Sequence, residues 1–178
     1  TSQPKYDNYI GMLAAIYRKL GKYEPAATLY LEAIAILEQT KRENHPRYIS
    51  HLVNLAISYW QTGQYQKAIP IYERVLSITE QTKGKNHKRY GTYLNNLALV
   101  YQKLGQYEAA IKLYQEALSI TEKTEGKSAT NYAKWLNNLS TVYQEMGQLN
   151  QSVDLLKQAL IIIEKKRGKD HPAYAKWT

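Results

Sequence analysis

Four histidines are the side chains in this sequence best suited to bind a metal or transfer a proton. They are His45, His51, His87 and His171, and three of them occupy one position of a pattern that recurs every 42 residues. Equivalent residues in stacked helical repeats lie about 15 to 20 Å apart, given about 8 to 10 Å between packed helices, so these three cannot share a zinc ion. His51 has no second ligand one helical turn later. We therefore interpret the histidines as structural residues near the starts of helices.

Other reactive groups also fail to assemble into a centre. Glu80, Glu122 and Glu164 share one position in the pattern and occur one at a time. The glycines are solitary, so no glycine-rich loop is available to hold a phosphate, and the chain has no cysteine to supply a thiolate. A catalytic centre is usually unique, whereas nearly every polar feature here recurs. We predict that the chain is not an enzyme and uses no cofactor and no metal.

The repeating pattern is the main feature of the chain. A fixed spacing of 42 residues separates the glycines Gly21, Gly63, Gly105 and Gly147, and the tyrosines Tyr17, Tyr59, Tyr101 and Tyr143. We predict one array over residues 1–178, with repeats at 1–43, 44–85, 86–127 and 128–169. Residues 170–178 are expected to start a truncated fifth repeat. Because no polar capping element is visible at either end, the chain is expected to be a fragment of a larger multidomain protein.

Each repeat carries the signals of two helices. In the second repeat the first helix is expected from about Pro46 to Thr62, ended by Gly63. A second helix with a broad apolar face follows after a loop of a few residues, so the two helices are antiparallel neighbours. A single hairpin cannot bury its apolar stripe, and we therefore predict an all-α, right-handed α-solenoid of stacked hairpins. The expected N-cap residues are Ser2, Asn44, Asn86, Ser128 and Asp170.

The order of small and aromatic residues resembles the tetratricopeptide repeat. Ala56, Ala98 and Ser140 are each followed three residues later by a tyrosine, then by the glycine and a small residue of the second helix. The 42-residue period and the sequence LNNLA at Leu94–Ala98 resemble more narrowly the repeats of kinesin light chains and their bacterial relatives. The resemblance covers the whole chain, and it implies a superhelix that binds other proteins.

In that family the first helix of each repeat lines a concave groove. Carried over by position, the resemblance implies that a peptide-binding groove is lined by Asn54, Trp60, Asn95, Asn96, Leu99, Lys103, Lys134, Asn137, Asn138 and Thr141. Paired asparagines are poor residues for the middle of a helix, and an amide can both donate to and accept from a peptide backbone. Two structural alternatives stay open. The amides could join neighbouring helices, and Trp60 could pack on its neighbour instead of forming a binding hot spot.

Two further sets of residues bear on packing and on the partner. Trp135 and Trp177 share a position with Tyr9, His51 and Tyr93, which indicates a packing site between repeats. Lys103 and Lys134 favour a partner with acidic residues, although Glu145 offsets them.

The chain is basic, with a net charge of +9 and a pI near 9.5. Its densest basic clusters, residues 83–89 and 165–169, lie at repeat junctions, where cations complement helix C-termini. We therefore do not favour nucleic acid as a partner. No apolar run reaches the roughly 18 residues of a membrane span. The absence of cysteine fits a reducing compartment, and we expect a cytoplasmic location.

The expected function is a non-catalytic protein–protein interaction scaffold that holds a partner peptide or protein segment in the groove. One alternative is nucleic-acid binding through the basic junctions. Another is a spacer or self-association module whose uncapped ends stack.

Overall fold

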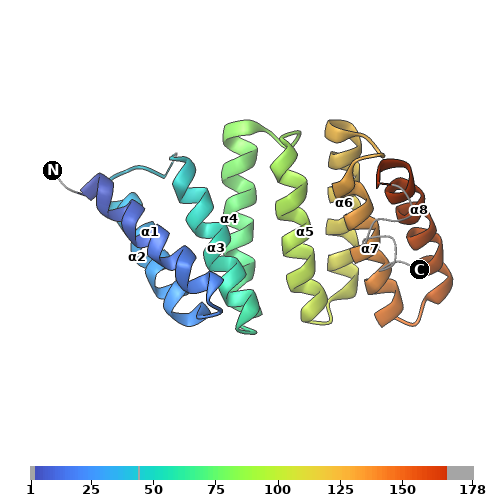
Figure 1. Ribbon diagram of the computed structural model, residues 1–178, viewed down its shortest axis with the longest axis horizontal. Helices are drawn as coiled ribbons and strands as arrows, with labels where there is room; N and C mark the ends of the chain where they lie inside the picture. The colour runs from blue at the N-terminus through green and yellow to red at the C-terminus, as the bar shows by residue number, and fades with distance from the viewer. Residues whose placement is uncertain (1–2, 44, 168–178) are drawn as a thin grey trace. The chain divides into compact units, whose positions relative to one another are not determined.

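The computed structural model describes residues 3–43 and 45–167. Within these ranges the chain forms eight α-helices and no strand (Figure 1). The helices are α1 (Gln3–Lys19), α2 (Tyr23–Gln39), α3 (Pro46–Gln61), α4 (Tyr65–Lys83), α5 (Lys88–Lys103), α6 (Tyr107–Glu125), α7 (Thr130–Glu145) and α8 (Leu149–Arg167). The fifth repeat predicted for residues 170–178 lies outside the described residues.

The chain divides into two compact units, the first ending at Ile78 and the second beginning at Thr79. In the first unit α1 packs on α2, and α2 also packs on α3. In the second unit α5 packs on α6, α6 on α7 and α7 on α8, and α5 also contacts α7 directly. Helices α2 and α6 therefore each pack against two neighbours, as expected of the second helix of a stacked hairpin.

Small residues at the helix contacts allow this close packing. Ala14 and Ala33 are fully buried in the first unit, as are Ala98, Ala110 and Ala117 in the second. Small side chains let the axes of neighbouring helices approach closely, and the larger apolar residues beside them fill the space between the helices. In the first helix of the third repeat, Leu94 and Leu97 are buried together with Ala98.

The N-caps lie one residue later than the sequence analysis predicted. Helices α3 and α5 are capped by His45 and His87, whose Nδ1 atoms accept from the backbone N–H groups of Arg47 (3.2 Å) and Arg89 (3.4 Å). Helix α7 begins after Ala129, which makes no side-chain cap. The imidazole Nδ1 stands three bonds from Cα, as the Oδ1 of asparagine does, so histidine can cap in the same way.

The predictions for Asn86 and Ser128 as N-caps are therefore wrong, because each lies one residue before the cap. The prediction of Asn44 is wrong as well, because His45 caps α3. The other two predicted caps, Ser2 and Asp170, lie outside the described residues.

The predicted glycine stops are confirmed. Gly63 and Gly105 have φ angles of 74° and 71°, in the left-handed region that other residues avoid. In each case the residue after the glycine donates its N–H to a carbonyl five residues earlier, as in the 2.8 Å bond from Gln64 to Tyr59. This bond satisfies a helix-terminal carbonyl and turns the chain into the next helix.

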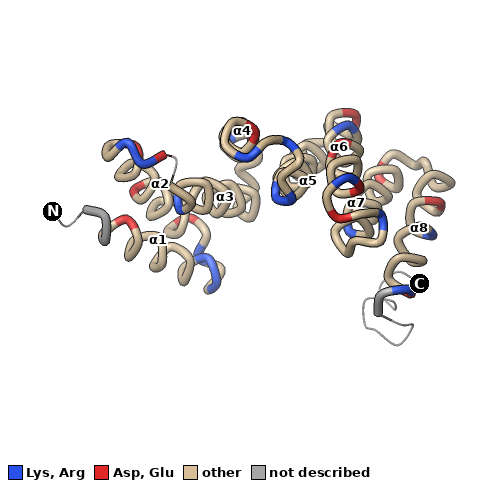
Figure 2. Tube along the Cα trace, turned by 90° about the horizontal axis from the view of Figure 1, so that it is seen from above, with Lys and Arg blue, Asp and Glu red and all other residues tan. Residues whose placement is uncertain are grey.

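Charged residues are distributed over both units. Figure 2 shows Lys and Arg on most of the helices, interspersed with Asp and Glu. At the junctions, Lys85 lies 3.5 Å from Glu80 and Lys127 lies 3.2 Å from Glu122. These pairs are exposed, so each contributes at most about 1 kcal/mol.

Candidate functional site

Four asparagine amides form a hydrogen-bonded chain across α5 and α7. Asn138 Nδ2 donates to Asn95 Oδ1 at 2.8 Å, which is a short bond between the two helices. Longer contacts of 3.5 Å and 3.4 Å extend the chain, from Asn137 to Asn138 and from Asn95 to Asn96. Every bond points the same way, from Asn137 toward Asn96. The amides therefore join neighbouring helices, which is the structural alternative raised by the sequence.

The amide chain leaves a donor at one end and an acceptor at the other. Asn96 Nδ2 donates none of the described hydrogen bonds, and Asn137 Oδ1 accepts none. Asn96, Asn137 and Asn138 are half-buried, whereas Asn95 is only 3% exposed. A ligand on this surface can reach the first three side chains, while Asn95 supports them from below.

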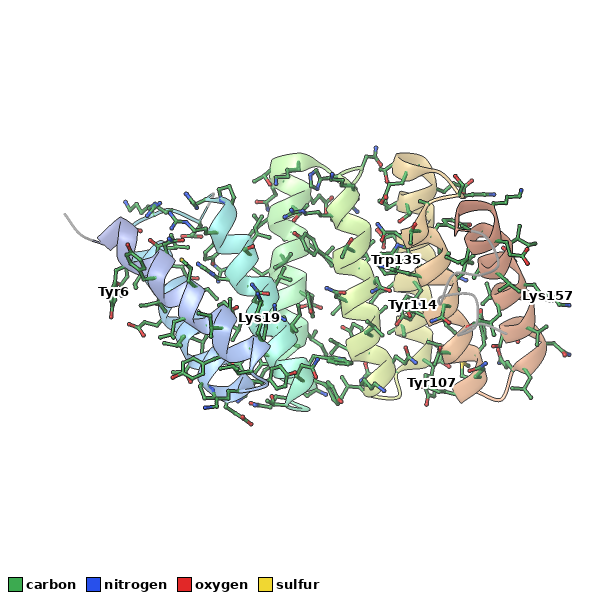
Figure 3. The ribbon with its side chains drawn as sticks, viewed as in Figure 1. Tyr6, Lys19, Tyr107, Tyr114, Trp135 and Lys157 are labelled. Carbon is green, nitrogen blue, oxygen red and sulfur yellow. The ribbon has the colours of Figure 1, made fainter. Side chains whose placement is uncertain are left out.

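A second polar contact joins the same two helices. Gln102 is 6% exposed and donates from Nε2 to Glu145 Oε1 at 3.0 Å. Its Oε1 accepts from the hydroxyl of Tyr114 on α6, also at 3.0 Å. Burial, together with the negative charge of Glu145, raises the pKa of Tyr114, so the phenol stays protonated and can donate. Figure 3 labels Tyr114 within the second unit.

The two cross-helix contacts form a regular pair of rungs. Asn95 to Asn138 and Gln102 to Glu145 each join residues 43 apart, and the second rung lies seven residues after the first on both helices. Seven residues are two helical turns, about 10.5 Å at 1.5 Å per residue. Helices α5 and α7 therefore run parallel and in constant register. We call the surface bearing Asn96, Leu99, Lys103, Lys134, Asn137, Asn138 and Thr141 the rung face.

The other predicted site residues of the second unit lie on the same two helices. On α5, Leu99 is half-buried and Lys103 is exposed. Asn96, Leu99 and Lys103 follow one another at intervals of about one helical turn. On α7, Lys134 is exposed and lies one turn before Asn138. The hydroxyl of Thr141 is half-buried and donates to the backbone oxygen of Asn137 at 3.1 Å.

Asn54 and Trp60, the remaining predicted residues, belong to the first unit and lie on α3. Both are half-buried. The indole Nε1 of Trp60 is buried and has no hydrogen-bond partner among the described residues. A buried donor without a partner costs free energy. The contacts within this unit therefore leave the indole N–H of Trp60 unsatisfied.

Trp135 and His51 occupy the packing site predicted between repeats. Trp135 on α7 is 6% exposed, and its Nε1 donates to Thr121 Oγ1 of α6 at 3.0 Å (Figure 3). His51 on α3 is equally buried, with its ring 5.9 Å from that of Tyr30 on α2. Burial lowers the pKa of His51, so it is neutral in the folded state. The packing prediction is confirmed for both residues, and Tyr93 on α5 is also 6% exposed. It is wrong for Tyr9 on α1, which is 65% exposed. Trp177 lies outside the described residues.

Sequence reasoning missed a buried charge in the first unit. Asp7 on α1 is fully buried, with its carboxylate oxygens 3.7 Å from Arg42 and 3.4 Å from Arg47. The sequence held a signal, because the equivalent positions carry Ile49, Gly91 and Ala133, which are apolar or small. A charge at such a position requires a cationic partner when it is buried.

Among the described residues, no three His, Cys, Asp or Glu side chains come together in a way that could hold a metal ion. None of the described helices is long and apolar enough to cross a membrane.

Comparisons with known proteins agree with this architecture. A family model of the tetratricopeptide repeat matches residues 7–81, 48–123 and 89–165. Among solved structures, the chain is similar to a kinesin light chain-like protein of Podosopora anserina with nearly identical TPR-like repeats. The identity is 28%, over 98% of this chain and 82% of that one, with a TM-score of 0.81. A variant of the same protein gives 26% identity, 99% and 84% coverage and a TM-score of 0.83.

The chain is also similar to BtubC (BKLC) from P. vanneervenii, with 26% identity over 94% of this chain and 67% of that one and a TM-score of 0.81. The comparison with curated proteins found no match. The predicted all-α fold and the likeness to kinesin light chain repeats are confirmed. The chain therefore belongs to the tetratricopeptide repeat family, whose repeats generally serve as non-catalytic scaffolds for protein interaction.

Proposed function

We propose that the chain binds a partner protein through an extended segment laid on the rung face of α5 and α7. The observation that carries this proposal is the amide chain, which has a free N–H donor at Asn96 and a free carbonyl acceptor at Asn137. An extended backbone presents both N–H and C=O groups, and the donor of Asn96 and the acceptor of Asn137 match that requirement. Since the bond between Asn138 and Asn95 holds these amides in place, a ligand would not have to order them.

The charges around the rung face favour an acidic partner segment. Lys103 and Lys134 are exposed and make none of the ion pairs seen among the described residues. Glu145 would oppose an acidic ligand, but one of its oxygens already accepts from Gln102. Between the rungs, Leu99 and Thr141 offer an apolar and a methyl-bearing surface for one side chain of the partner.

Peptide display tests the proposal directly. The purified chain is panned against a random peptide library, and the affinities of enriched peptides are measured for the parent, for Asn96→Ala and for Lys103→Ala with Lys134→Ala. Asn150 and Lys112 are exposed residues of α8 and α6, so Asn150→Ala and Lys112→Ala are matched controls. We expect enrichment of acidic sequences, at least a tenfold loss for the rung-face variants and unchanged binding for the controls.

Two results would contradict the proposal. One is the absence of any enriched peptide, and the other is binding that survives the rung-face substitutions but is lost in a control. Asn138→Ala would not discriminate, because it also breaks the bond to Asn95, and a loss of binding would then also follow from a shift of α7.

Nucleic-acid binding is the second candidate, and the basic junctions favour it. Lys85 and Lys127 are exposed there, but each already lies near a glutamate of its own junction. Phosphate binding would make affinity fall steeply with salt, because each neutralised phosphate releases counterions. We expect no such steep dependence for a 20-nucleotide DNA or RNA probe between 50 and 200 mM salt.

A further inference from the structure

Helices α2, α3 and α4 line an open cleft in the first unit, with a volume of about 690 Å³. Leu52 and Leu55 of α3, which are 3% and 2% exposed, form its base beside the ring of Tyr59. The walls are mostly apolar as well, with Leu31, Ile34 and Ala35 on α2 and Pro70 and Ile71 on α4. Sites for small ligands typically enclose about 300 to 1,000 Å³ of mostly apolar space, and this cleft has that size and lining. We call it the α2–α4 cleft.

The apolar walls of the α2–α4 cleft are not required by the fold. Two repeats later in the sequence, the positions of Leu31, Ala35 and Pro70 are occupied by Gln115, Ser119 and Asp154. The second unit folds with these polar residues, all of which are exposed. Helix α2 belongs to the first repeat and α3 and α4 to the second, so the cleft lies between two described repeats and not at an end of the array. Its apolar walls are therefore a distinct property of the first unit.

Pro70 in the wall of the cleft breaks a local rule. It lies in the interior of α4, where proline removes one helical hydrogen bond and its ring crowds the preceding turn. The equivalent positions carry Thr28, Lys112 and Asp154, so proline occurs in one repeat alone. Residues that oppose the local structure are expected mainly at functional sites. Pro70 gives this wall an apolar surface without a backbone N–H.

One end of the cleft is closed by groups that neutralise each other. Arg74 of α4 lies 3.0 Å from Glu38 of α2, and its guanidinium carbon lies 5.2 Å from the centre of the Tyr48 ring. The hydroxyl of Tyr48 donates to Glu38 at 2.7 Å. This end therefore offers no unpaired charge to a ligand.

The other end of the cleft carries a cation without a counterion. Lys67 precedes Arg74 by seven residues, which is two helical turns or about 10.5 Å along α4. Its ammonium group lies 5.4 Å from the centre of the Tyr59 ring and donates to Gln64 at 2.7 Å. Lys67 is exposed and makes none of the ion pairs seen among the described residues. A ligand with an anionic group at this end would supply the missing charge.

The geometry of the cleft favours an alkyl chain over a segment of protein. The ion pair between Glu38 and Arg74 joins α2 to α4, so the space between them does not admit a helix of about 10 to 12 Å diameter. An extended peptide would bring backbone N–H and C=O groups between walls that carry no polar side chain from one end to the other. Such groups are costly to bury without partners. An alkyl chain has none.

We propose that the α2–α4 cleft binds a linear alkyl carboxylate of medium or long chain. The carboxylate lies at Lys67, and the chain follows Leu31, Leu55 and Ile71 toward the closed end. Charge pairing at the head and removal of the chain from water at the tail both favour binding. The rung face lies on α5 and α7, so this proposal is independent of the proposed function.

Equilibrium dialysis of the whole chain against hexanoate, octanoate and decanoate, each below its micelle-forming concentration, tests the proposal. We expect the affinity to rise about fourfold for each added CH₂ group, because each one buries further apolar surface. Decyltrimethylammonium has a chain of the same length as decanoate but a cationic head. It should bind about tenfold more weakly or less, since its charge would face Lys67.

Two variants with matched controls locate the ligand. Ala35→Phe fills the cleft and should lower decanoate affinity about tenfold or more, whereas Ser119→Phe, at the equivalent exposed position of α6, should not change it. Lys67→Gln should lower decanoate affinity about tenfold and remove the preference over decyltrimethylammonium. Lys157 is exposed on α8 (Figure 3), and Lys157→Gln is the control for the loss of one positive charge. Far-UV circular dichroism checks that all four variants fold.

Three results would overturn the proposal. The first is that none of the three carboxylates binds, and the second is an affinity that does not depend on chain length. The third is binding that both Ala35→Phe and Lys67→Gln leave intact, or that the two controls reduce equally, because the ligand would then lie outside the α2–α4 cleft.

Discussion

Removing the hydroxyl of Tyr114 should destabilise the second unit by about 1 to 3 kcal/mol. Tyr114 is fully buried and donates to Oε1 of Gln102, which is itself only 6% exposed. Tyr114→Phe keeps the ring in place but leaves the Gln102 carbonyl with no donor and out of reach of water. The expected cost is the desolvation of that unsatisfied group, which exceeds the roughly 1 kcal/mol net value of an ordinary hydrogen bond.

A double-mutant cycle separates this cost from simple loss of contacts. Gln102→Leu alone leaves the Tyr114 hydroxyl buried and unpaired, while Glu145 is exposed and returns to water. The combined variant has neither buried polar group. We expect it to be more stable than the sum of the single variants predicts, by about 1 to 3 kcal/mol.

Urea unfolding followed by far-UV circular dichroism measures these differences. For a chain of 178 residues, 1 kcal/mol corresponds to a shift of about 2 to 4 °C in Tm, so a thermal scan gives a second reading. Tyr107 is half-buried on the same helix and makes no described side-chain hydrogen bond, so Tyr107→Phe is the control. If Tyr114→Phe were as mild as the control, or if the coupling energy were near zero, the buried bond to Gln102 would be refuted.

Three further predictions concern the first unit. Replacing Arg42 and Arg47 together by alanine should cost about 3 to 5 kcal/mol in urea unfolding, since the buried Asp7 would keep an uncompensated charge. Asp7→Ala should cost less, because the arginines are partly exposed and can turn to water. Burial lowers the pKa of His51, so its share of stability is complete above about pH 6.5 and is lost as the pH falls toward the folded-state pKa. His51→Gln should therefore reduce the drop in Tm between pH 7.5 and 5.5. Gly11→Ala would place a Cβ onto Cε1 of His51 and should cost about 1 to 3 kcal/mol, part of which His51→Ala restores in the double variant.

Backbone signals in the sequence predicted the helices closely. Helix α3 was expected from about Pro46 to Thr62 and runs from Pro46 to Gln61. Its ends were predictable because proline fixes the first turn and glycine supplies the left-handed stop at Gly63. The N-cap of α3 was predicted one residue too early, because asparagine is in general a more common N-cap residue than histidine. A proline at the first helical position already implied that the residue just before it, His45, is the cap.

The site was less predictable, and the paired asparagines show why. Asn95 and Asn96 are adjacent, so on a helix their side chains point about 100° apart. Which of the two turns toward α7 depends on the rotation of α5, and that rotation is set by packing against α6 and α7 together. The sequence therefore identified the pair, whereas the structure shows Asn95 buried in the interface and Asn96 accessible. Asp7 was missed for a related reason, since Arg42 and Arg47 meet it only in the packed unit.

The rungs also address a problem that repeated sequences create. Apolar contacts do not distinguish one neighbour from another, because Leu55, Leu97 and Leu139 are identical residues at one position and are all buried. The polar contacts do distinguish them. The position of Glu145 is occupied by Lys103 in the preceding repeat, and an ammonium group has no acceptor for the N–H of Gln102. A mispaired helix would therefore bury Gln102 unsatisfied, at a cost of about 1 to 3 kcal/mol. We infer that the polar differences between otherwise similar repeats favour the correct order of stacking, and that the same differences give the rung face its individual chemistry.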